Sequence, residues 1–230
     1  MPRRRFRCLS QAVRYFGYRA LRRGLGLEVS HAMLFDLSRA GPIDNDSPGY
    51  EFRFLSPDDV WAFAADPAND LDAAMADRLV AGDDVCFAAI HGSRLANYNW
   101  YAFGGIEAEH AMRVPMTLPA GFAYLYKGFT HPDYRGRGLN YATVLRALHA
   151  LRDQGMEQIV GIIEYANWPS LTSYRRFRPV PLGLLMTLGQ GRPRWVRYPP
   201  RAKAIGVEFG REAENRRAAH AVSELAASAS

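Results

Sequence analysis

The chain has 230 residues, of which 48% are hydrophobic and 23% are charged. This composition is typical of a soluble globular protein, and the length suits one domain with extensions or at most two small domains. No run of about 18 apolar residues is present, which excludes a predicted membrane-spanning helix. The two cysteines, Cys8 and Cys86, lie in no metal-ligand spacing. We therefore expect free thiols in a reducing compartment and no metal site.

The net charge of +6 is concentrated at the start of the chain. Residues 1–23 contain eight arginines and no acidic residue, which indicates an anionic partner such as membrane phosphates, nucleic acid or an acidic substrate. Four of these arginines, between positions 14 and 23, interrupt the apolar stretch that an export signal requires. We therefore expect a cytoplasmic protein.

Residues 6–23 have the period of an amphipathic helix. Its apolar row comprises Phe6, Leu9, Val13, Phe16 and Ala20, and its polar row comprises Arg4, Arg7, Gln11, Arg14 and Tyr18. The helix either packs on its own domain, lies on the inner face of an anionic membrane through residues 1–24, or binds RNA. Nucleic acid is not expected as a partner, because no nucleic-acid motif accompanies the charge.

The remaining elements follow from hydrophobic period and from turn residues. We expect a basic helix and lead-in at 1–38, a turn-rich linker at 39–49, the main domain at 50–198, and a charged, Ala/Ser-rich tail at 199–230 that frays. Within the domain, strands are predicted at 50–56, 84–92, 94–104, 122–130, 158–164, 180–188 and 193–198, helices at 57–65, 68–80, 138–153 and 168–176, and a loop at 105–121. This order predicts a mixed α/β layer, with one parallel crossover from strand 122–130 through helix 138–153 to strand 158–164.

The loop "HPDYRGRGLN", residues 131–140, joins a strand to a helix. A helix start presents backbone N–H groups without intrahelical partners, and the helix dipole adds partial positive charge there. Gly136 and Gly138 would let a phosphate approach the backbone, while Arg135 and Arg137 supply charge-assisted donors. By its residues alone, the loop is therefore either a diphosphate site or a basic solvated turn. It is neither a P-loop, since no Gly-Lys-Ser/Thr follows, nor a dinucleotide fingerprint, since GxGxxG is absent.

A second segment, "EYANWPSLTSYRRF" at 164–177, carries Asn167, Ser170 and Tyr174 at offsets of three and seven. Together with "YRGRGLN", it resembles the Gcn5-related N-acetyltransferase (GNAT) superfamily. Arg135 and Gly138 match the family's Arg/Gln-x-x-Gly-x-Gly/Ala pattern, and the three residues of the second segment match its Asn-x-x-Ala/Ser pattern with a later tyrosine. Asn140 departs from the first of these patterns, because the family usually has glycine or alanine at this position. Over residues 122–188 the resemblance rests on these sequence motifs, and over residues 50–121 it rests only on the predicted order of helices and strands.

The resemblance implies a mostly antiparallel sheet with helices on both faces. Strands 122–130 and 158–164 would splay apart and admit the pantetheine arm of an acyl-CoA. Backbone N–H groups near Gly128 and Phe129 would polarise the thioester carbonyl. The coenzyme-binding residues implied in this way are Gly128, Phe129, Arg135, Gly136, Arg137, Gly138, Asn140, Asn167 and Ser170.

Tyr174 is the matched position for the acid that protonates the departing thiolate, and its alternative is simple packing against the sheet. Asn167 either anchors the coenzyme or caps a helix. Glu164, at a strand end beside the expected cleft, is the first candidate for a general base. His131 is the second, because an unperturbed histidine pKa of about 6.5 suits that task. For both residues the alternative is a structural or solvated side chain. An aromatic stripe would either line an acceptor pocket or pack in the core: Tyr98, Trp100 and Tyr101.

The resemblance and the loop together predict an acyl-CoA-dependent N-acyltransferase, with acetyl-CoA as the expected donor. Its partners would be the acyl-CoA and an amine acceptor of unknown identity, and a homodimer stays open. Two alternatives remain: a long-chain acyl or O-acyl transferase of the same fold, and a catalytically inert module that binds coenzyme A or membrane.

Overall fold

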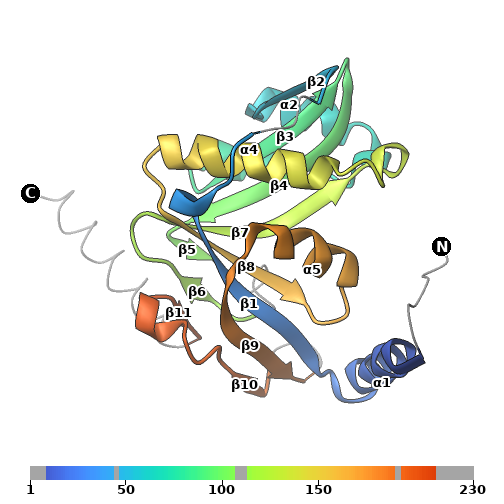
Figure 1. Ribbon diagram of the computed structural model, residues 1–230, viewed down its shortest axis with the longest axis vertical. Coiled ribbons are helices and arrows are strands. Elements are labelled where there is room, and N and C mark those ends of the chain that lie inside the picture. Colours follow the sequence, from blue (N-terminus) through green and yellow to red (C-terminus); the bar gives the residue numbers. More distant parts are fainter. Residues whose placement is uncertain (1–8, 44–46, 107–112, 190–192, 211–230) are drawn as a thin grey trace, which may run out of the picture.

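The computed structural model describes residues 9–43, 47–106, 113–189 and 193–210, and its elements form a layered α/β fold (Figure 1). Its main sheet has eight strands in the order β10-β9-β1-β8-β7-β4-β3-β2. These strands are β1 (Glu28–Asp36), β2 (Tyr50–Phe54), β3 (Asp84–His91), β4 (Arg94–Phe103), β7 (Phe122–Thr130), β8 (Gln158–Glu164), β9 (Val180–Leu188) and β10 (Trp195–Arg197). Only the β7–β8 pair of this described sheet is parallel.

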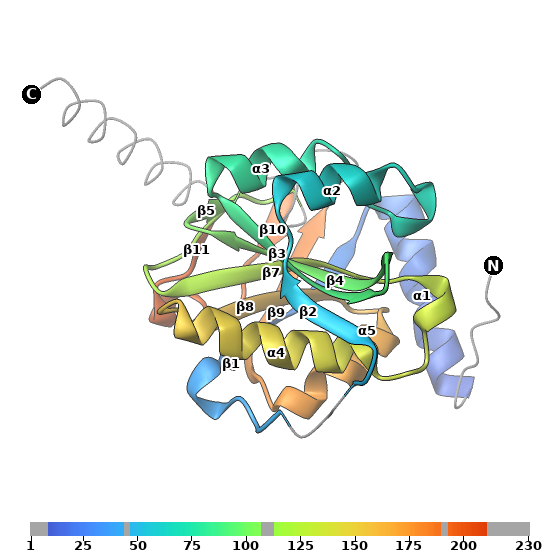
Figure 2. The ribbon, with the colours of Figure 1, turned by 90° about the horizontal axis from the view of Figure 1, so that it is seen from above.

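Helices cover both faces of the sheet, as Figure 2 shows edge-on. They are α1 (Leu9–Leu25), α2 (Pro57–Ala64), α3 (Met75–Ala81), α4 (Leu139–Asp153) and α5 (Trp168–Tyr174). Helices α2 and α3 lie on one face, where Val60 and Ala76 pack with Trp100. Helix α4 lies on the other face, where Val144 and Leu148 pack with strand residues. The expected mostly antiparallel sheet between two helical layers is confirmed.

The capping of α2 follows directly from its sequence. Ser56 accepts a hydrogen bond from the Asp59 N–H, and the Asp59 carboxylate accepts from the Ser56 N–H, which completes a capping box with Pro57 at the first turn. Helix α3 instead begins at Met75, later than the predicted 68. A short 3-10 turn at Pro67–Asn69 and a left-handed Asp70 (φ 52°) occupy the intervening chain.

Strand β1 changes the expected domain boundary. The lead-in of 1–38 contains this strand, which pairs with β8 on one side and β9 on the other. Residues 28–36 therefore lie inside the sheet and not before it, and the linker at 39–49 connects two parts of one domain. The cause is physical: β1 finds its hydrogen-bond partners more than a hundred residues away, and such pairing leaves little local signal.

Two further segments are more ordered than the sequence predicts. The expected loop at 105–121 contributes β5 (Gly105–Ile106) and β6 (Met116–Thr117), which form a small sheet with β11 (Glu208–Phe209). The expected tail is folded up to residue 210, because Val207 and Phe209 are buried beside Met116. Burial of these apolar side chains offsets the conformational entropy that the chain loses when it becomes ordered. The rest of the predicted tail, 211–230, and the leader's first eight residues, with Cys8 among them, lie outside the described residues.

Helix α1 packs on the domain through a face that the apolar row did not predict. Tyr15 and Tyr18 are buried against Val29 and Ala166, and the Tyr18 hydroxyl accepts a hydrogen bond from the Val29 N–H. Phe16, from the predicted apolar row, is 61% exposed. Tyr18, from the predicted polar row, thus faces the protein, and Phe16, from the predicted apolar row, does not.

Candidate active site

The site begins where two neighbouring strands separate. Strands β7 and β8 pair in parallel only over Phe122–Leu125 and Gln158–Gly161, although both strands continue beyond these residues. A cleft of about 970 Å³ opens at this end of the pair. Ten of the twelve predicted site residues line it: Gly128, Phe129, Arg135, Gly136, Gly138, Asn140, Glu164, Asn167, Ser170 and Tyr174.

The glycine–arginine loop forms one wall of the cleft. Gly136 and Gly138 have φ values of 80° and 72°, a left-handed conformation that favours glycine. Gly138 is also the N-cap of α4, so the turn delivers the chain into the helix start. The Arg135 Nε–H donates to the Thr130 carbonyl at 3.0 Å, which anchors this side chain to the end of β7. The loop therefore presents a helix N-terminus and a fixed guanidinium to the cleft.

Helix α5 holds Tyr174 on the opposite wall. The helix starts at Asn167, whose side chain accepts from the Ser170 N–H at 3.4 Å, so Asn167 caps the helix as well as lining the cleft. Tyr174 is buried, and the ring of Phe35 from β1 meets it edge-on at 5.7 Å. Burial raises the pKa of Tyr174 to about 12, against a smaller lowering effect of Asn140. Tyr174 is thus a neutral hydroxyl donor at physiological pH.

Two buried asparagines that no sequence motif indicated lie under the cleft. Asn97 and Asn99 on β4 are both fully buried. The Asn97 amide donates to the Phe129 carbonyl at 2.6 Å, and the Asn99 amide donates to Asn97 at 3.2 Å. The Tyr174 hydroxyl lies 3.5 Å from the Asn99 side-chain oxygen, to which it donates. The sequence of the strand could have indicated this pair. Two asparagines at alternate positions of a mostly apolar strand face the same side of the sheet, where each needs a hydrogen-bond partner if it is buried.

Asn140, the position that departs from the family pattern, is tied into this same polar group. Its oxygen lies 3.4 Å from the Asn97 amide nitrogen, and its own amide nitrogen lies 3.4 Å from the Ser173 hydroxyl. The side chain thus bridges the start of α4 to β4 and to α5.

Replacing Gly128 with alanine will disturb this arrangement. A Cβ at this position would lie 2.6 Å from the Asn99 side-chain oxygen, which is buried and cannot simply swing into solvent. We expect a loss of about 1–3 kcal/mol in the free energy of unfolding, as for other overpacked sites. Urea denaturation measures it. Gly17→Ala, in helix α1 with no atom within 4 Å of its Cβ, is the matched control and should be neutral or stabilising. An unchanged stability for Gly128→Ala would contradict the described contact.

The other predicted residues lie elsewhere. His131 does not line the cleft: it is 7% exposed, and its Nδ1 accepts from the Asp133 N–H at 3.3 Å. Arg137 is also outside the lining, with its guanidinium over the Tyr134 ring at 5.4 Å. The aromatic stripe belongs to the core, since its members are fully buried: Tyr98, Trp100 and Tyr101.

Solved structures share this architecture at low sequence identity. A GCN5-related N-acetyltransferase-like protein from Streptococcus suis matches over 74% of this chain and 65% of its own, at 12% identity and a TM-score of 0.50. A GCN5-related N-acetyltransferase from Sphaerobacter thermophilus matches over 75% and 54%, again at 12% identity and a TM-score of 0.50. The chain has the GNAT fold. A Drosophila protein also matches, over 84% of this chain and 59% of its own, at 13% identity and a TM-score of 0.50.

The GNAT-fold chain therefore spans between 54% and 65% of the length of these three structures. No protein-family model matches its sequence, and no curated protein matches it. Among the described residues, no helix is long and apolar enough to cross a membrane. The same part of the chain contains no group of His, Cys, Asp and Glu side chains that could hold a metal ion.

Proposed function

We propose that the chain is an N-acyltransferase that uses acetyl-CoA, or another acyl-CoA, and an amine acceptor. The observation that carries this proposal is the cleft between β7 and β8, which has the glycine–arginine loop on one wall and a buried tyrosine on the other. A pantetheine arm would lie between the separated strands. Its pyrophosphate would meet the start of α4 and Arg135.

The reaction proceeds without a covalent enzyme intermediate. The nitrogen of a neutral amine forms a bond to the thioester carbon, and the C–S bond then breaks. The nitrogen loses one proton, the departing thiolate gains one, and the products are an amide and free coenzyme A. Backbone N–H groups near Gly128 and Phe129 stabilise the oxyanion, and Tyr174 donates a proton or a hydrogen bond to the thiolate.

Glu164 is the proposed base that accepts the proton from the amine. It ends strand β8 and lines the cleft, and its Oε1 accepts a hydrogen bond from Arg22 at 2.9 Å. The carboxylate is therefore held at the cleft while its second oxygen can face an acceptor. His131 is not given this role, because its ring is packed outside the cleft.

Coenzyme A binding tests the assignment of the cleft. Replacing Arg135 with glutamine removes a charge-assisted contact to the pyrophosphate, which we expect to cost roughly 1.5–3 kcal/mol in binding free energy. Isothermal titration calorimetry with free coenzyme A measures this loss. Arg137→Gln, two positions along the same loop but outside the cleft lining, is the matched control and should lose less. Equal affinity in the wild type and in Arg135→Gln would contradict the proposal. A Gly138 substitution is less informative, because its φ of 72° would strain any other residue.

We also propose that residues 1–24 contact an anionic membrane surface at the cytoplasmic face. In α1, Leu21 and Leu25 lie four residues apart on the same side of the helix and are 46% and 59% exposed, and Phe16, on a different side, is 61% exposed. Arginines accompany these apolar side chains on the same helix. This combination suits the boundary between acyl chains and anionic headgroups, where each arginine adds about 1 kcal/mol.

Sedimentation with vesicles tests this contact. The double variant Leu21→Ser/Leu25→Ser should bind phosphatidylserine-containing vesicles at least about tenfold more weakly, since two neighbouring apolar side chains no longer enter the lipid. Val80→Ser removes an apolar side chain that is 69% exposed on α3, and serves as control. Equal sedimentation of all three proteins, or strong binding to neutral vesicles, would contradict the proposal.

A further inference from the structure

The turn that follows helix α5 brings a guanidinium to the start of α4. This turn is a 3-10 turn at Arg175–Phe177. It places the guanidinium carbon of Arg176 at 3.6 Å from the centre of the Tyr141 ring. Tyr141 is the third residue of α4, whose N-cap is Gly138. Arg176 and Tyr141 both line the cleft, as Gly138 does. Arg176 therefore lies beside the proposed diphosphate site.

Aromatic contacts position this guanidinium and leave its hydrogen-bond donors available. Arg176 meets the face of the Tyr141 ring, and this ring is stacked on Phe177 with centroids 4.7 Å apart. Phe177 meets the buried ring of Phe35 edge-on at 6.2 Å, which ties the stack to the core. A guanidinium has five N–H donors. Within the described residues, no acceptor takes a hydrogen bond from those of Arg176.

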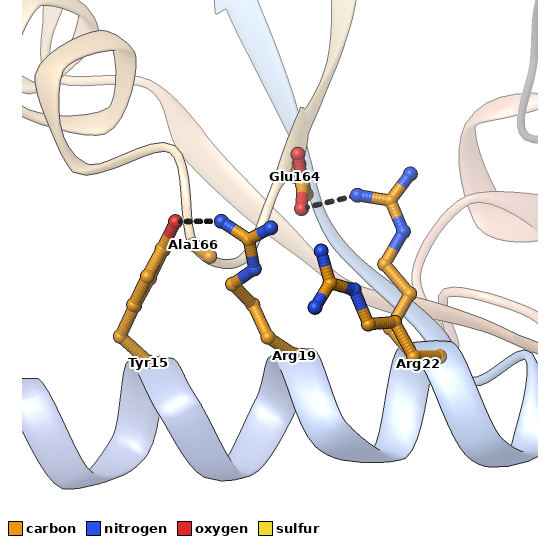
Figure 3. Close-up of a pocket in the computed structure, with 6 residues that line it drawn as sticks. Tyr15, Arg19, Arg22, Glu164 and Ala166 are labelled. Atoms are coloured by element: carbon orange, nitrogen blue, oxygen red, sulfur yellow. Dashed lines mark hydrogen bonds and ion pairs between the residues drawn. The ribbon is translucent and has the colours of Figure 1, made fainter. Parts of the chain in front are cut away.

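The balance of charge in the cleft favours an anion at this guanidinium. Among the described residues that line the cleft, the charged ones are Lys127, Arg135, Glu164 and Arg176. The Lys127 ammonium lies 3.6 Å from the Asp70 carboxylate. Glu164 is paired at 2.9 Å with Arg22, which reaches it from α1 (Figure 3). In the described part of the chain, neither Arg135 nor Arg176 pairs with a carboxylate.

Coenzyme A has two anionic groups that suit two such guanidinium groups. One is its diphosphate, which the start of α4 and Arg135 are proposed to bind. The other is the phosphate on the 3′ oxygen of its ribose, which carries about two negative charges near neutral pH. Guanidinium groups present paired N–H donors that match phosphate oxygens and keep their charge at every physiological pH.

We infer that Arg176 binds the 3′-phosphate of coenzyme A, held in place by the ring of Tyr141. The inference rests on the proposed use of an acyl-CoA, and it names the residue that recognises the donor. The protein would then accept acyl groups from coenzyme A in preference to the same pantetheine arm on a carrier without a 3′-phosphate.

Arg137 is the competing cation for this phosphate. It belongs to the same loop as Arg135, and it would meet a ribose that turned toward the loop. However, its guanidinium lies over the Tyr134 ring at 5.4 Å, and it does not line the cleft. A variant of each arginine therefore separates the two positions.

Calorimetry with coenzyme A and with dephospho-coenzyme A, which lacks only the 3′-phosphate, measures the contact in the full-length protein. The wild type should bind coenzyme A at least about tenfold more tightly, as one charge-assisted contact supplies. In Arg176→Gln the ratio of the two affinities should fall to about one, since that contact is lost. In Arg176→Glu the dephospho form should bind more tightly, because the new carboxylate repels the phosphate. Equal wild-type affinities, or a wild-type ratio in Arg176→Gln, would overturn the inference.

Three further variants connect the preference to this one side chain. Arg178→Gln is the matched control, because Arg178 is exposed two positions along the chain and does not line the cleft. It should keep the wild-type ratio. Arg135→Gln should weaken the binding of both ligands, since both contain the diphosphate. Loss of the preference in Arg137→Gln together with its retention in Arg176→Gln would move the 3′-phosphate to the loop, against the inference. Circular dichroism melting verifies that each variant is folded.

Failure of the inference can be told apart from failure of acyl transfer. If both ligands bind equally and amines still release thiol from acetyl-CoA, Arg176 is not a phosphate site and the proposed reaction stands. If coenzyme A binds with the expected preference but no amine releases thiol, the role of Arg176 stands and acyl transfer is wrong. If neither ligand binds and no amine releases thiol, both are wrong.

Discussion

Deletion of residues 1–38 will abolish folding, whereas deletion of residues 1–26 will leave a folded domain. The longer deletion removes β1, and with it seven backbone register pairs to β8 and seven to β9. It also removes Phe35 and Ala32, which are buried in the two cores on either side of the sheet. The shorter deletion removes α1 and the residues that precede it but keeps β1; among the described side chains of α1, Tyr15 and Tyr18 are the ones buried against the domain.

Circular dichroism melting of the two truncated proteins measures this difference. The protein that lacks 1–38 should show no cooperative transition, because β8 and β9 cannot reach each other across the position of β1. The protein that lacks 1–26 should melt cooperatively at a reduced temperature. A cooperative transition in the longer deletion would show that β1 is dispensable, and would contradict the described sheet order.

Replacement of Tyr174 by phenylalanine will lower kcat by about 10²–10⁴-fold, the usual contribution of general acid catalysis. Coenzyme A affinity should change little, because the ring and its contacts with Phe35 remain. The raised pKa of about 12 means that wild-type Tyr174 keeps its proton through pH 10. Its activity should therefore rise with pH as the acceptor amine deprotonates, without a fall caused by Tyr174.

Single-turnover rates for the variant provide the measurement, with calorimetry for affinity. Tyr124→Phe changes another buried tyrosine that does not line the cleft, and serves as the control. Full single-turnover activity in Tyr174→Phe would assign the proton on the thiolate to water or to another residue.

Local patterns predicted the elements that line the cleft. The strand–loop–helix at 122–153 and the short helix before Tyr174 are visible in sequence, because glycine, proline and capping residues punctuate them at short range. The cleft itself also follows from this segment. Its two walls are the loop and the short helix, and both lie within about fifty residues of the chain.

The place of strand β1 and the orientation of α1 depend on long-range packing, and the sequence did not predict them. Strand β1 reads as a short apolar run after a basic helix, and its place between β8 and β9 depends on partners far along the chain. The orientation of α1 was also missed. Its two buried tyrosines, Tyr15 and Tyr18, combine ring burial with a polar tip, so these residues, and not the apolar Phe16, face the domain. Among the loop arginines, the family pattern already distinguishes Arg135 from Arg137, and in the fold Arg135 lines the cleft whereas Arg137 does not.

Thiol release from acetyl-CoA in the presence of an amine panel distinguishes an acyltransferase from a protein that only binds coenzyme A. We expect amine-dependent release of coenzyme A, with mass spectrometry showing one acyl group added to the nitrogen of the acceptor. We also expect Arg135→Gln and Tyr174→Phe to reduce this release for different reasons, the first through binding and the second through turnover. Binding of coenzyme A without thiol release for any amine would contradict acyl transfer, and would make the chain a module that binds the coenzyme without using it.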